Sequence, residues 1–135
     1  MQNEYFAPGI SADTRFFWEG AKEHKLTAQR CKKCGKLRWP AAYLCPDCLS
    51  EETEIAELSG EGTLYSYTTF HRPFHPSLSE KLPYVVCEAD LKEGIRMVSN
   101  LVETKGSGPE CGACLRVCWQ DFEGYTKPVF EMEEV

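Results

Sequence analysis

The chain has 135 residues, a length typical of a single domain, with room for one sizeable core but not for two large ones. Hydrophobic residues make up 42% of the chain and charged residues 27%, which is ordinary for a globular protein and excludes a disordered or fibrous chain. No apolar run approaches the roughly 18 residues of a membrane span, and the N-terminus lacks the layout of a secretory signal, so we expect a cytoplasmic protein without a membrane partner.

The net charge of −6 is distributed unevenly along the chain. Residues 1–50 contain eight Lys and Arg against five Asp and Glu, whereas residues 51–135 contain seven against sixteen. The second part therefore carries a net charge of −9, which would repel a polyanion. This distribution disfavours a nucleic-acid partner and leaves the N-terminal part suited at most to a compact anion.

Residues 1–28 are expected to form an irregular arm followed by one short amphipathic helix. The stretch 11–24 begins with residues that suit an N-cap and contains no Pro and only one Gly. Phe16, Phe17 and Trp18 follow one another, which is more aromatic surface than one core-facing stripe of a helix buries. We therefore expect some of these three side chains to dock on a neighbouring chain or on the rest of this one.

Residues 29–58 contain two Cys-x-x-Cys motifs separated by ten residues. Two such turns that face each other bring four sulfurs to the corners of a tetrahedron, the geometry that Zn²⁺ takes in closed structural sites. Iron in a rubredoxin-like site uses the same ligands, and zinc is favoured because the chain shows no other redox feature. With sulfur at all four positions no place is left for a catalytic water, so one structural ion is expected. The predicted ligands are Cys31, Cys34, Cys45 and Cys48.

From residue 59 to residue 135 the sequence changes to short β segments separated by turn residues. A proline-rich stretch at 73–83 reads as a loop, and no second helix is expected. This amount of chain suits a five-stranded Greek-key barrel of the OB type better than a sandwich. The predicted fold is thus mainly β: an N-terminal helix, a rubredoxin-like zinc ribbon and a C-terminal OB-fold barrel. The expected strands lie at 63–71, 84–91, 95–102, 114–122 and 129–132.

Six motifs in this order carry a resemblance to a known family: FWEG at 17–20, CKKCG at 31–35, CPDC at 45–48, GEGTLYS at 60–66, PYVV at 83–86, and LKEGIR at 91–96 followed by SNLV at 99–102. Over nearly its whole length the chain resembles the paired zinc-ribbon and OB-fold proteins once catalogued as a domain of unknown function, whose members often accompany thiolases. The resemblance implies a non-catalytic subunit that binds acyl-coenzyme A and docks on a thiolase-like or hydratase-like catalytic subunit in a hetero-oligomer. A partner that degrades benzylsuccinyl-type or other aromatic acyl-CoA compounds falls within it.

The resemblance also implies candidate contacts for coenzyme A and for the partner. Basic residues around the ribbon would meet the phosphates of coenzyme A at the seam between ribbon and barrel. By its position at the end of the first long strand, beside Arg72 and a loop, His71 would touch a ligand or the partner. A hydrated surface is the alternative for all of them. Relatives carry Arg where this chain has Ala42, so this protein would do without that arginine or use Arg38 or Lys36 instead. The candidate coenzyme A contacts are Lys32, Lys33, Lys36, Arg38, His71 and Arg72, and the candidate docking residues are Phe16, Phe17 and Trp18.

The remaining cysteines allow two interpretations. Cys111 and Cys114 imitate a third Cys-x-x-Cys turn, which would form a redox disulfide or join Cys87 and Cys118 around a second metal. The favoured interpretation is burial, in which Cys114 and Cys118 are small apolar fillers on one face of a strand and Cys111 replaces an aliphatic residue.

Two other functions compete with an accessory role. OB barrels and zinc ribbons both bind single-stranded nucleic acids, although the acidic barrel portion disfavours that here. A self-sufficient enzyme needs a nucleophile with a base at suggestive spacing, and we find none among the three histidines or in any elbow motif. We therefore expect no catalytic residue in this chain and activity only as a required subunit of an acyl-CoA thiolase, acyltransferase, hydratase or aldolase complex.

Overall fold

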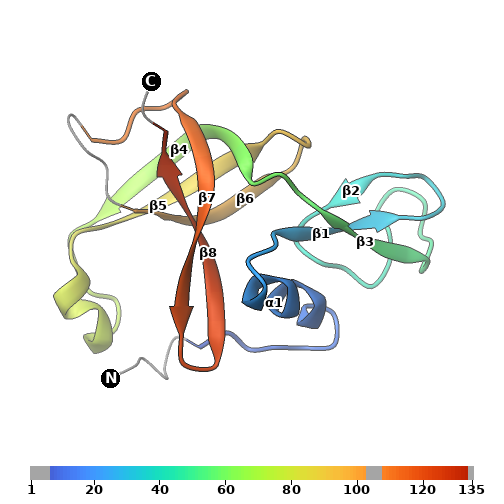
Figure 1. Ribbon diagram of the computed structural model, residues 1–135, viewed down its shortest axis with the longest axis horizontal. Helices are drawn as coiled ribbons and strands as arrows, with labels where there is room; N and C mark the ends of the chain where they lie inside the picture. The colour runs from blue at the N-terminus through green and yellow to red at the C-terminus, as the bar shows by residue number, and fades with distance from the viewer. Residues whose placement is uncertain (1–6, 103–107, 134–135) are drawn as a thin grey trace.

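The computed structural model describes residues 7–102 and 108–133 (Figure 1). The expected arm at residues 1–6 lies outside the described residues. Within the described part, no helix has the length and apolar character needed to cross a membrane. The elements in chain order are α1 (Arg15–Lys22), β1 (Thr27–Cys31), β2 (Leu37–Arg38), β3 (Thr53–Glu57), β4 (Glu61–Phe70), the 3₁₀ helix η2 (Pro76–Lys81), β5 (Tyr84–Leu91), β6 (Arg96–Leu101), β7 (Cys114–Phe122) and β8 (Tyr125–Met132).

The N-terminal helix α1 is shorter than the sequence pattern predicts. Thr14 is its N-cap and makes no side-chain cap bond, and the helix ends at Lys22, before His24. His24 adopts a positive φ of 59°, which ends the helix and turns the ring onto Trp119 of β7, with ring centroids 5.3 Å apart and planes 4° from parallel. The C-terminal end of α1 is therefore fastened to the barrel by an aromatic stack.

The three consecutive aromatics of α1 all pack on this chain. Phe17 is 4% exposed and lies 4.4 Å, centroid to centroid, from Trp39 of the ribbon. Trp18 contacts Tyr125 of β8 edge to face, and Phe16 lies partly buried against the same core. The sequence leaves open whether these side chains dock on a neighbouring chain or on the rest of this one. In the structure they pack on this chain. The helix joins ribbon and barrel by packing on both.

Strands β1, β2 and β3 form the small antiparallel sheet of the ribbon, in the order β2-β1-β3. It lies at one end of the molecule's long axis, and η2 lies at the other end (Figure 1). The short β2 follows the first cysteine turn, and the second cysteine turn lies in the connection from β2 to β3. The sheet therefore holds both cysteine turns at the end of the molecule remote from η2.

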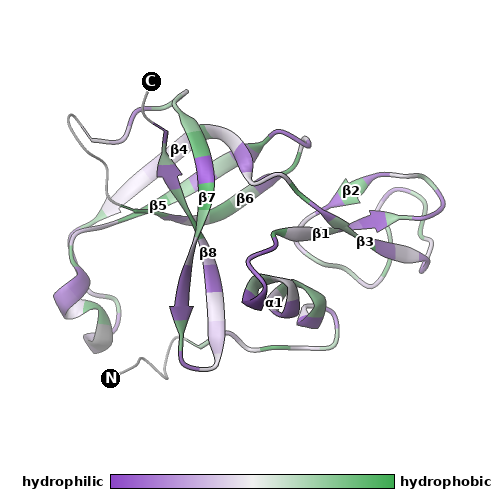
Figure 2. Cartoon of the chain, in the orientation of Figure 1, coloured by the Kyte–Doolittle hydropathy of each residue, from purple (hydrophilic) through white to green (hydrophobic). Residues whose placement is uncertain are grey.

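The remaining strands close into a five-stranded barrel with the order β4-β5-β6-β8-β7, which confirms the predicted OB-type fold. All neighbours are antiparallel except β6 and β8. Two expectations differ in detail. The loop at 73–83 contains η2, and the last strand begins at Tyr125 because Gly124, with φ of 91°, lets β7 turn directly into β8. Along β7, hydrophobic residues are interrupted by hydrophilic ones (Figure 2).

The Gly60-Glu-Gly motif marks the point where the ribbon's chain enters the barrel. A Cβ on Gly60 would lie 2.3 Å from Cγ1 of Val117, and one on Gly62 would lie 2.3 Å from the carbonyl oxygen of Asp90. Gly60 also has a φ of +79°. Only glycine fits at both positions, so the motif has a packing function. One hydrophobic core runs from α1 through β1 into the barrel, and it includes Phe17, Ala28, Leu64, Leu115 and Phe130.

Candidate functional site

The four predicted metal ligands lie together in the ribbon. Cys31 ends β1 and Cys34 follows in the turn, while Cys45 and Cys48 come from the second turn. Their four Sγ atoms all lie within 4.8 Å of one another. The Sγ atoms of Cys31 and Cys48 are 3.5 Å apart, and those of Cys34 and Cys45 are 3.7 Å apart. Tetrahedral ligands at a Zn–S distance of about 2.3 Å lie about 3.8 Å apart, so these thiols fit a single ion.

Backbone amides donate toward the cysteine sulfurs and favour the thiolate form of Cys31 and Cys45, whereas burial and the neighbouring thiols raise the pKa of Cys34 and, to about 11, that of Cys48. The N–H of Cys34 donates to Sγ of Cys31 over 3.4 Å, and this bond is the main reason that the pKa of Cys31 falls to about 6. The pKa of Cys45 is lowered in the same way, first by the N–H of Cys48. Lys36 and Asp47, from the two turns, form an ion pair with an Nζ–Oδ2 distance of 3.3 Å. The site can therefore hold a cation without rearranging the turns.

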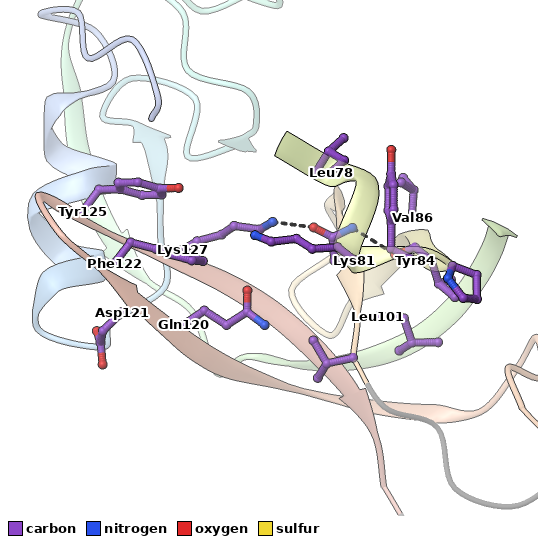
Figure 3. A pocket seen from close by; sticks show the side chains of 14 residues that line it. Leu78, Lys81, Tyr84, Val86, Leu101, Gln120, Asp121, Phe122, Tyr125 and Lys127 are labelled. Atoms are coloured by element: carbon purple, nitrogen blue, oxygen red, sulfur yellow. Dashed lines mark hydrogen bonds between the residues drawn. The ribbon is translucent and has the colours of Figure 1, made fainter. Parts of the chain in front are cut away.

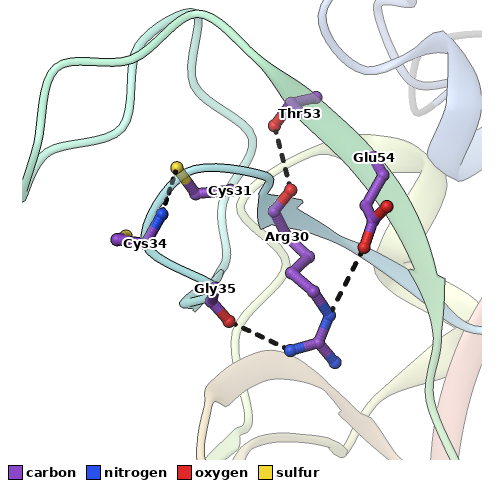
Figure 4. Close-up of polar contacts among 6 residues, drawn as sticks. All are labelled: Arg30, Cys31, Cys34, Gly35, Thr53 and Glu54. Atoms are coloured by element: carbon purple, nitrogen blue, oxygen red, sulfur yellow. Dashed lines mark hydrogen bonds and ion pairs between the residues drawn. The ribbon is translucent and has the colours of Figure 1, made fainter.

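Arg30, in β1, connects the first cysteine turn to the neighbouring strand β3. Its Nη1 donates to the carbonyl oxygen of Gly35 over 3.0 Å, its Nε lies 4.0 Å from a carboxylate oxygen of Glu54, and its own carbonyl accepts from Thr53 Oγ1 (Figure 4). A turn and a neighbouring strand are thus joined through one guanidinium. Sequence reasoning did not single out Arg30, because its contact to Glu54 depends on the pairing of β1 with β3.

Arg38, a candidate coenzyme A contact, is buried in the ribbon at 8% exposure. Its Nε donates to Oε1 of Gln29 over 2.8 Å, and its Nη2 donates to Thr53 and to the carbonyl of Ala42. The amide of Ala42 donates to the same Gln29 oxygen, at 2.9 Å. Arg38 therefore ties β1, β2 and β3 to the loop that leads to the second cysteine turn.

The other basic candidates do not form one cluster. Lys32, Lys33 and Lys36 are exposed on the first cysteine turn. His71 and Arg72 are also exposed, but they follow β4, whose ten residues span about 30 Å and lead away from the ribbon toward η2 (Figure 1). The structure does not bring these two groups together, so a single phosphate cannot contact both.

The expected burial of the remaining cysteines is partly wrong. Cys87 is buried and Cys118 is half-buried, but Cys111 and Cys114 are exposed. The reason is that Cys114 pairs with Thr63 where β7 begins, at the rim of the barrel and not in its interior. All four are free thiols, and within residues 7–102 and 108–133 none of them belongs to a cluster of three or more potential metal ligands.

A cleft of about 1120 Å³ lies on the barrel beside η2. Its walls come from η2, β5, β6 and the β7–β8 hairpin, and they include the side chains of Lys81 and Lys127 (Figure 3). These are the segments that flank the ligand face of OB folds. Sequence reasoning missed both lysines, because they are 46 positions apart and meet only through barrel closure. Assigning the 73–83 stretch to the loop beside the OB ligand face would have pointed to this region, but the sequence pattern indicates only a loop there.

A four-cysteine ribbon joined through one helix to a five-stranded OB barrel defines a two-module class of protein. Two family models match the chain: "ChsH2, rubredoxin-like zinc ribbon domain" over residues 18–54 and "ChsH2, C-terminal OB-fold domain" over residues 56–120. In a solved structure described as "Ltp2-ChsH2(DUF35) aldolase", one chain is 38% identical, with a TM-score of 0.85 over 93% of this chain and 98% of that chain. The protein belongs to the ChsH2-type DUF35 family.

Several relatives are named as subunits of enzymes. The chain is 39% identical over 124 residues to the "Probable enoyl-CoA hydratase alpha subunit" of Thermomonospora curvata, covering 91% of this chain and 38% of that protein. It is 39% identical over 82 residues to the "Benzoylsuccinyl-CoA thiolase subunit BbsA" of Thauera aromatica, covering 61% of this chain and 55% of that protein. The chain therefore spans about two fifths of the first relative and just over half of the second.

Proposed function

We propose that this protein is an accessory subunit of an acyl-CoA complex in which a thiolase-like, hydratase-like or aldolase-like partner performs the chemistry. The observation that carries the proposal is the likeness, over nearly the full length of both chains, to a chain of the Ltp2-ChsH2(DUF35) aldolase. The names of the hydratase and thiolase relatives support the same role. Residues 29–58 act in this proposal as a ribbon module and residues 59–135 as a barrel module, joined by the helix within residues 1–28.

The ribbon's part in this function is structural. We propose that Cys31, Cys34, Cys45 and Cys48 hold one ion, with zinc favoured over iron, because the sulfur spacings match tetrahedral coordination. An ion bound there would crosslink the two cysteine turns. All four coordination positions would be filled by sulfur, so the ion would not activate water.

The ribbon is also the proposed docking surface for the catalytic partner. Of the nine large hydrophobic residues that are exposed in the described part of the chain, four lie in the ribbon. This is a high density for a module of this size, and exposed apolar surface of this kind is typical of an interface. The four are Tyr43, Leu44, Leu49 and Ile55. Phe16, Phe17 and Trp18, by contrast, already pack on the chain's own core.

Contact with the coenzyme A part of the substrate is proposed for Lys32 and Lys33. Both side chains are exposed on the first cysteine turn, whereas Arg38 is committed to three acceptors inside the ribbon. Lys36 is exposed as well, and it would need to release Asp47 to bind a phosphate. A ribbon that docks on the catalytic subunit while presenting these cations would hold the substrate's phosphate end at the interface.

Reconstitution tests the proposal. The chain and a candidate thiolase-like or aldolase-like partner are purified separately, and carbon–carbon bond formation or cleavage in acyl-CoA substrates is measured for each alone and for the mixture. We expect a stable complex in size-exclusion chromatography and activity only in the mixture. Turnover by this chain alone, or no gain over the partner alone, would contradict the accessory role.

A matched pair of variants tests the docking surface. Ile55→Asp places a charge on the exposed edge strand of the ribbon, and Val98→Asp places one on an exposed position of the barrel. We expect Ile55→Asp to weaken complex formation at least tenfold, because an unpaired charge in an apolar interface is costly. Val98→Asp should bind as the unmodified chain does. If Val98→Asp weakened complex formation and Ile55→Asp did not, the interface would lie on the barrel and not on the ribbon.

A further inference from the structure

The cleft beside η2 combines apolar walls with converging cations. Its apolar lining includes Pro83, Tyr84, Leu101, Phe122 and Tyr125. The amino groups of Lys81 and Lys127 point toward each other across it, one from η2 and one from β8 (Figure 3). Apolar walls with a few convergent polar groups are typical of small-molecule sites.

Lys127 is fixed in the cleft by a short chain of hydrogen bonds. Its Nζ donates to Oδ1 of Asn100, and Nδ2 of Asn100 donates to the carbonyl of Val85 over 3.0 Å. The second bond sets the orientation of the amide, so that its oxygen faces the ammonium. Lys127 is therefore held in place by β5 and β6 before any ligand arrives.

The positive charge in the cleft is not balanced by a carboxylate within the described residues. Neither lysine forms an ion pair there, and Nζ of Lys81 lies 5.6 Å from the ring centre of Phe122. Asp121 lines the same cleft, but its carboxylate points away from the lysines and accepts hydrogen bonds from His24 and Thr126 (Figure 3). The charges of Lys81 and Lys127 are therefore not neutralised by any carboxylate of the described residues.

Electrostatics point in the same direction. Burial, followed by the nearby charge of Lys81, lowers the pKa of Lys127. Two like charges close together, one of them on the half-buried Lys127, cost free energy, and a bound anion between them removes that cost. A ligand with a negative head therefore gains more here than at an isolated surface lysine.

We propose that this cleft binds an amphipathic organic anion, with a carboxylate or phosphate head between Lys81 and Lys127 and an apolar or aromatic body against Tyr84, Phe122 and Tyr125. The site is separate from the ribbon lysines, which lie at the opposite end of the long axis (Figure 1). It does not depend on the proposed accessory function, because the whole cleft belongs to this chain. In an acyl-CoA complex the head has two sources, a free carboxylate on the acyl group or a phosphate of coenzyme A.

Calorimetric titration of the full chain tests the proposal, with phenylsuccinate and coenzyme A as the anionic probes and phenylsuccinamide as the uncharged match. Binding of phenylsuccinate assigns the head to a carboxylate, and binding of coenzyme A that competes with it assigns the head to a phosphate. We expect Lys81→Met and Lys127→Met each to weaken the bound probe at least tenfold, as loss of one charge-assisted hydrogen bond implies. Lys92→Met, on the exposed β5–β6 turn, should leave the affinity unchanged.

The fold is monitored for each variant by circular dichroism. Lys81 makes no hydrogen bond to the barrel within the described residues, so Lys81→Met keeps the test valid if Lys127→Met fails to fold. No binding of either anionic probe, equal binding of the amide, or binding unaffected by Lys81→Met would overturn the proposal. Preferential binding of oligothymidylate that depends on both lysines would also overturn it, and would assign the cleft to a single-stranded nucleic acid.

Discussion

Leu49 occupies in the second cysteine turn the position that Gly35 occupies in the first. Each residue directly follows the second cysteine of its pair, and each has a positive φ, 63° for Leu49 and 80° for Gly35. The N–H of Gly35 donates to the carbonyl of Cys31 over 2.9 Å, and the N–H of Leu49 donates to that of Cys45 over 2.8 Å. The two turns thus share one backbone conformation, which glycine adopts freely and leucine adopts at a cost of about 1–2 kcal/mol.

This relationship predicts opposite effects for two substitutions. Gly35→Ala should lower the free energy of unfolding of the metal-loaded protein by about 1 kcal/mol or more, because the φ of +80° is strained for alanine although nothing lies within 4 Å of its Cβ. Leu49→Gly should raise it by up to about 1 kcal/mol, since relief of strain outweighs the flexibility gained by the unfolded chain. Urea denaturation measures both.

Gly9→Ala is the matched control for this pair. Its Cβ would also meet nothing within 4 Å, and its φ lies outside the left-handed region. The change should leave the free energy of unfolding within about 0.5 kcal/mol of that of the unmodified chain. Equal effects of Gly35→Ala and Gly9→Ala would show that the turn is not strained.

Leu49 is 70% exposed, so Leu49→Gly should also weaken partner binding if the ribbon is the docking surface.

Removal of one cysteine ligand should release the metal and unfold the ribbon. Cys48→Ser replaces one of the four clustered sulfurs, and structural zinc sites contribute several kcal/mol to folding. Elemental analysis should find one zinc or iron per unmodified chain and much less than one in the variant. Visible absorbance separates iron from zinc.

Cys111→Ser is the control for the ligand variant, because Cys111 is an exposed thiol outside the metal cluster. It should keep the full metal content and the same thermal midpoint. Finding one metal ion per chain in Cys48→Ser, or folded unmodified protein that contains no metal, would contradict a metal site made of four sulfurs.

Replacing Arg38 should lower the stability of the protein and leave its affinity for coenzyme A unchanged. Arg38→Met removes the donors to Gln29, Thr53 and the carbonyl of Ala42, and it leaves Gln29 with a single partner, the amide of Ala42. Loss of a buried, charged donor of this kind costs about 2–4 kcal/mol in the free energy of unfolding. Lys32→Met, on the exposed turn, should change stability by less than about 0.5 kcal/mol while weakening coenzyme A binding. Equal stability losses would contradict the structural role of Arg38.

The sequence predicts what depends on local chemistry. The cysteine spacing predicts the clustered thiols, and alternation with turn residues predicts five strands, because both patterns act within a few residues of chain. The sequence does not predict those features that depend on closure of the barrel. Cys114 has the strand periodicity of a core residue but lies at the rim, and Lys81 and Lys127 meet only when η2 and β8 come together. The basic character of Arg38 suggests a ligand contact, yet sheet pairing buries it.

The contact between α1 and β7 should make stability depend on pH. Hydrogen bonds from His24, at 3.1 Å, and from Thr126, at 2.7 Å, hold the pKa of Asp121 below its usual value. A carboxyl whose pKa is lowered by folding stabilises the protein above its unfolded pKa of about 3.9, and this contribution is lost as the pH falls through the folded pKa. The free-energy difference between the unmodified chain and Asp121→Asn should therefore be fully present at pH 5 and above and shrink toward pH 3. Measuring the difference at each pH cancels loss of metal, which affects both proteins. Glu19→Gln, at an exposed position of α1, should show no such trend, and a difference for Asp121→Asn that stays constant with pH would mean that this carboxylate does not fasten the helix to the barrel.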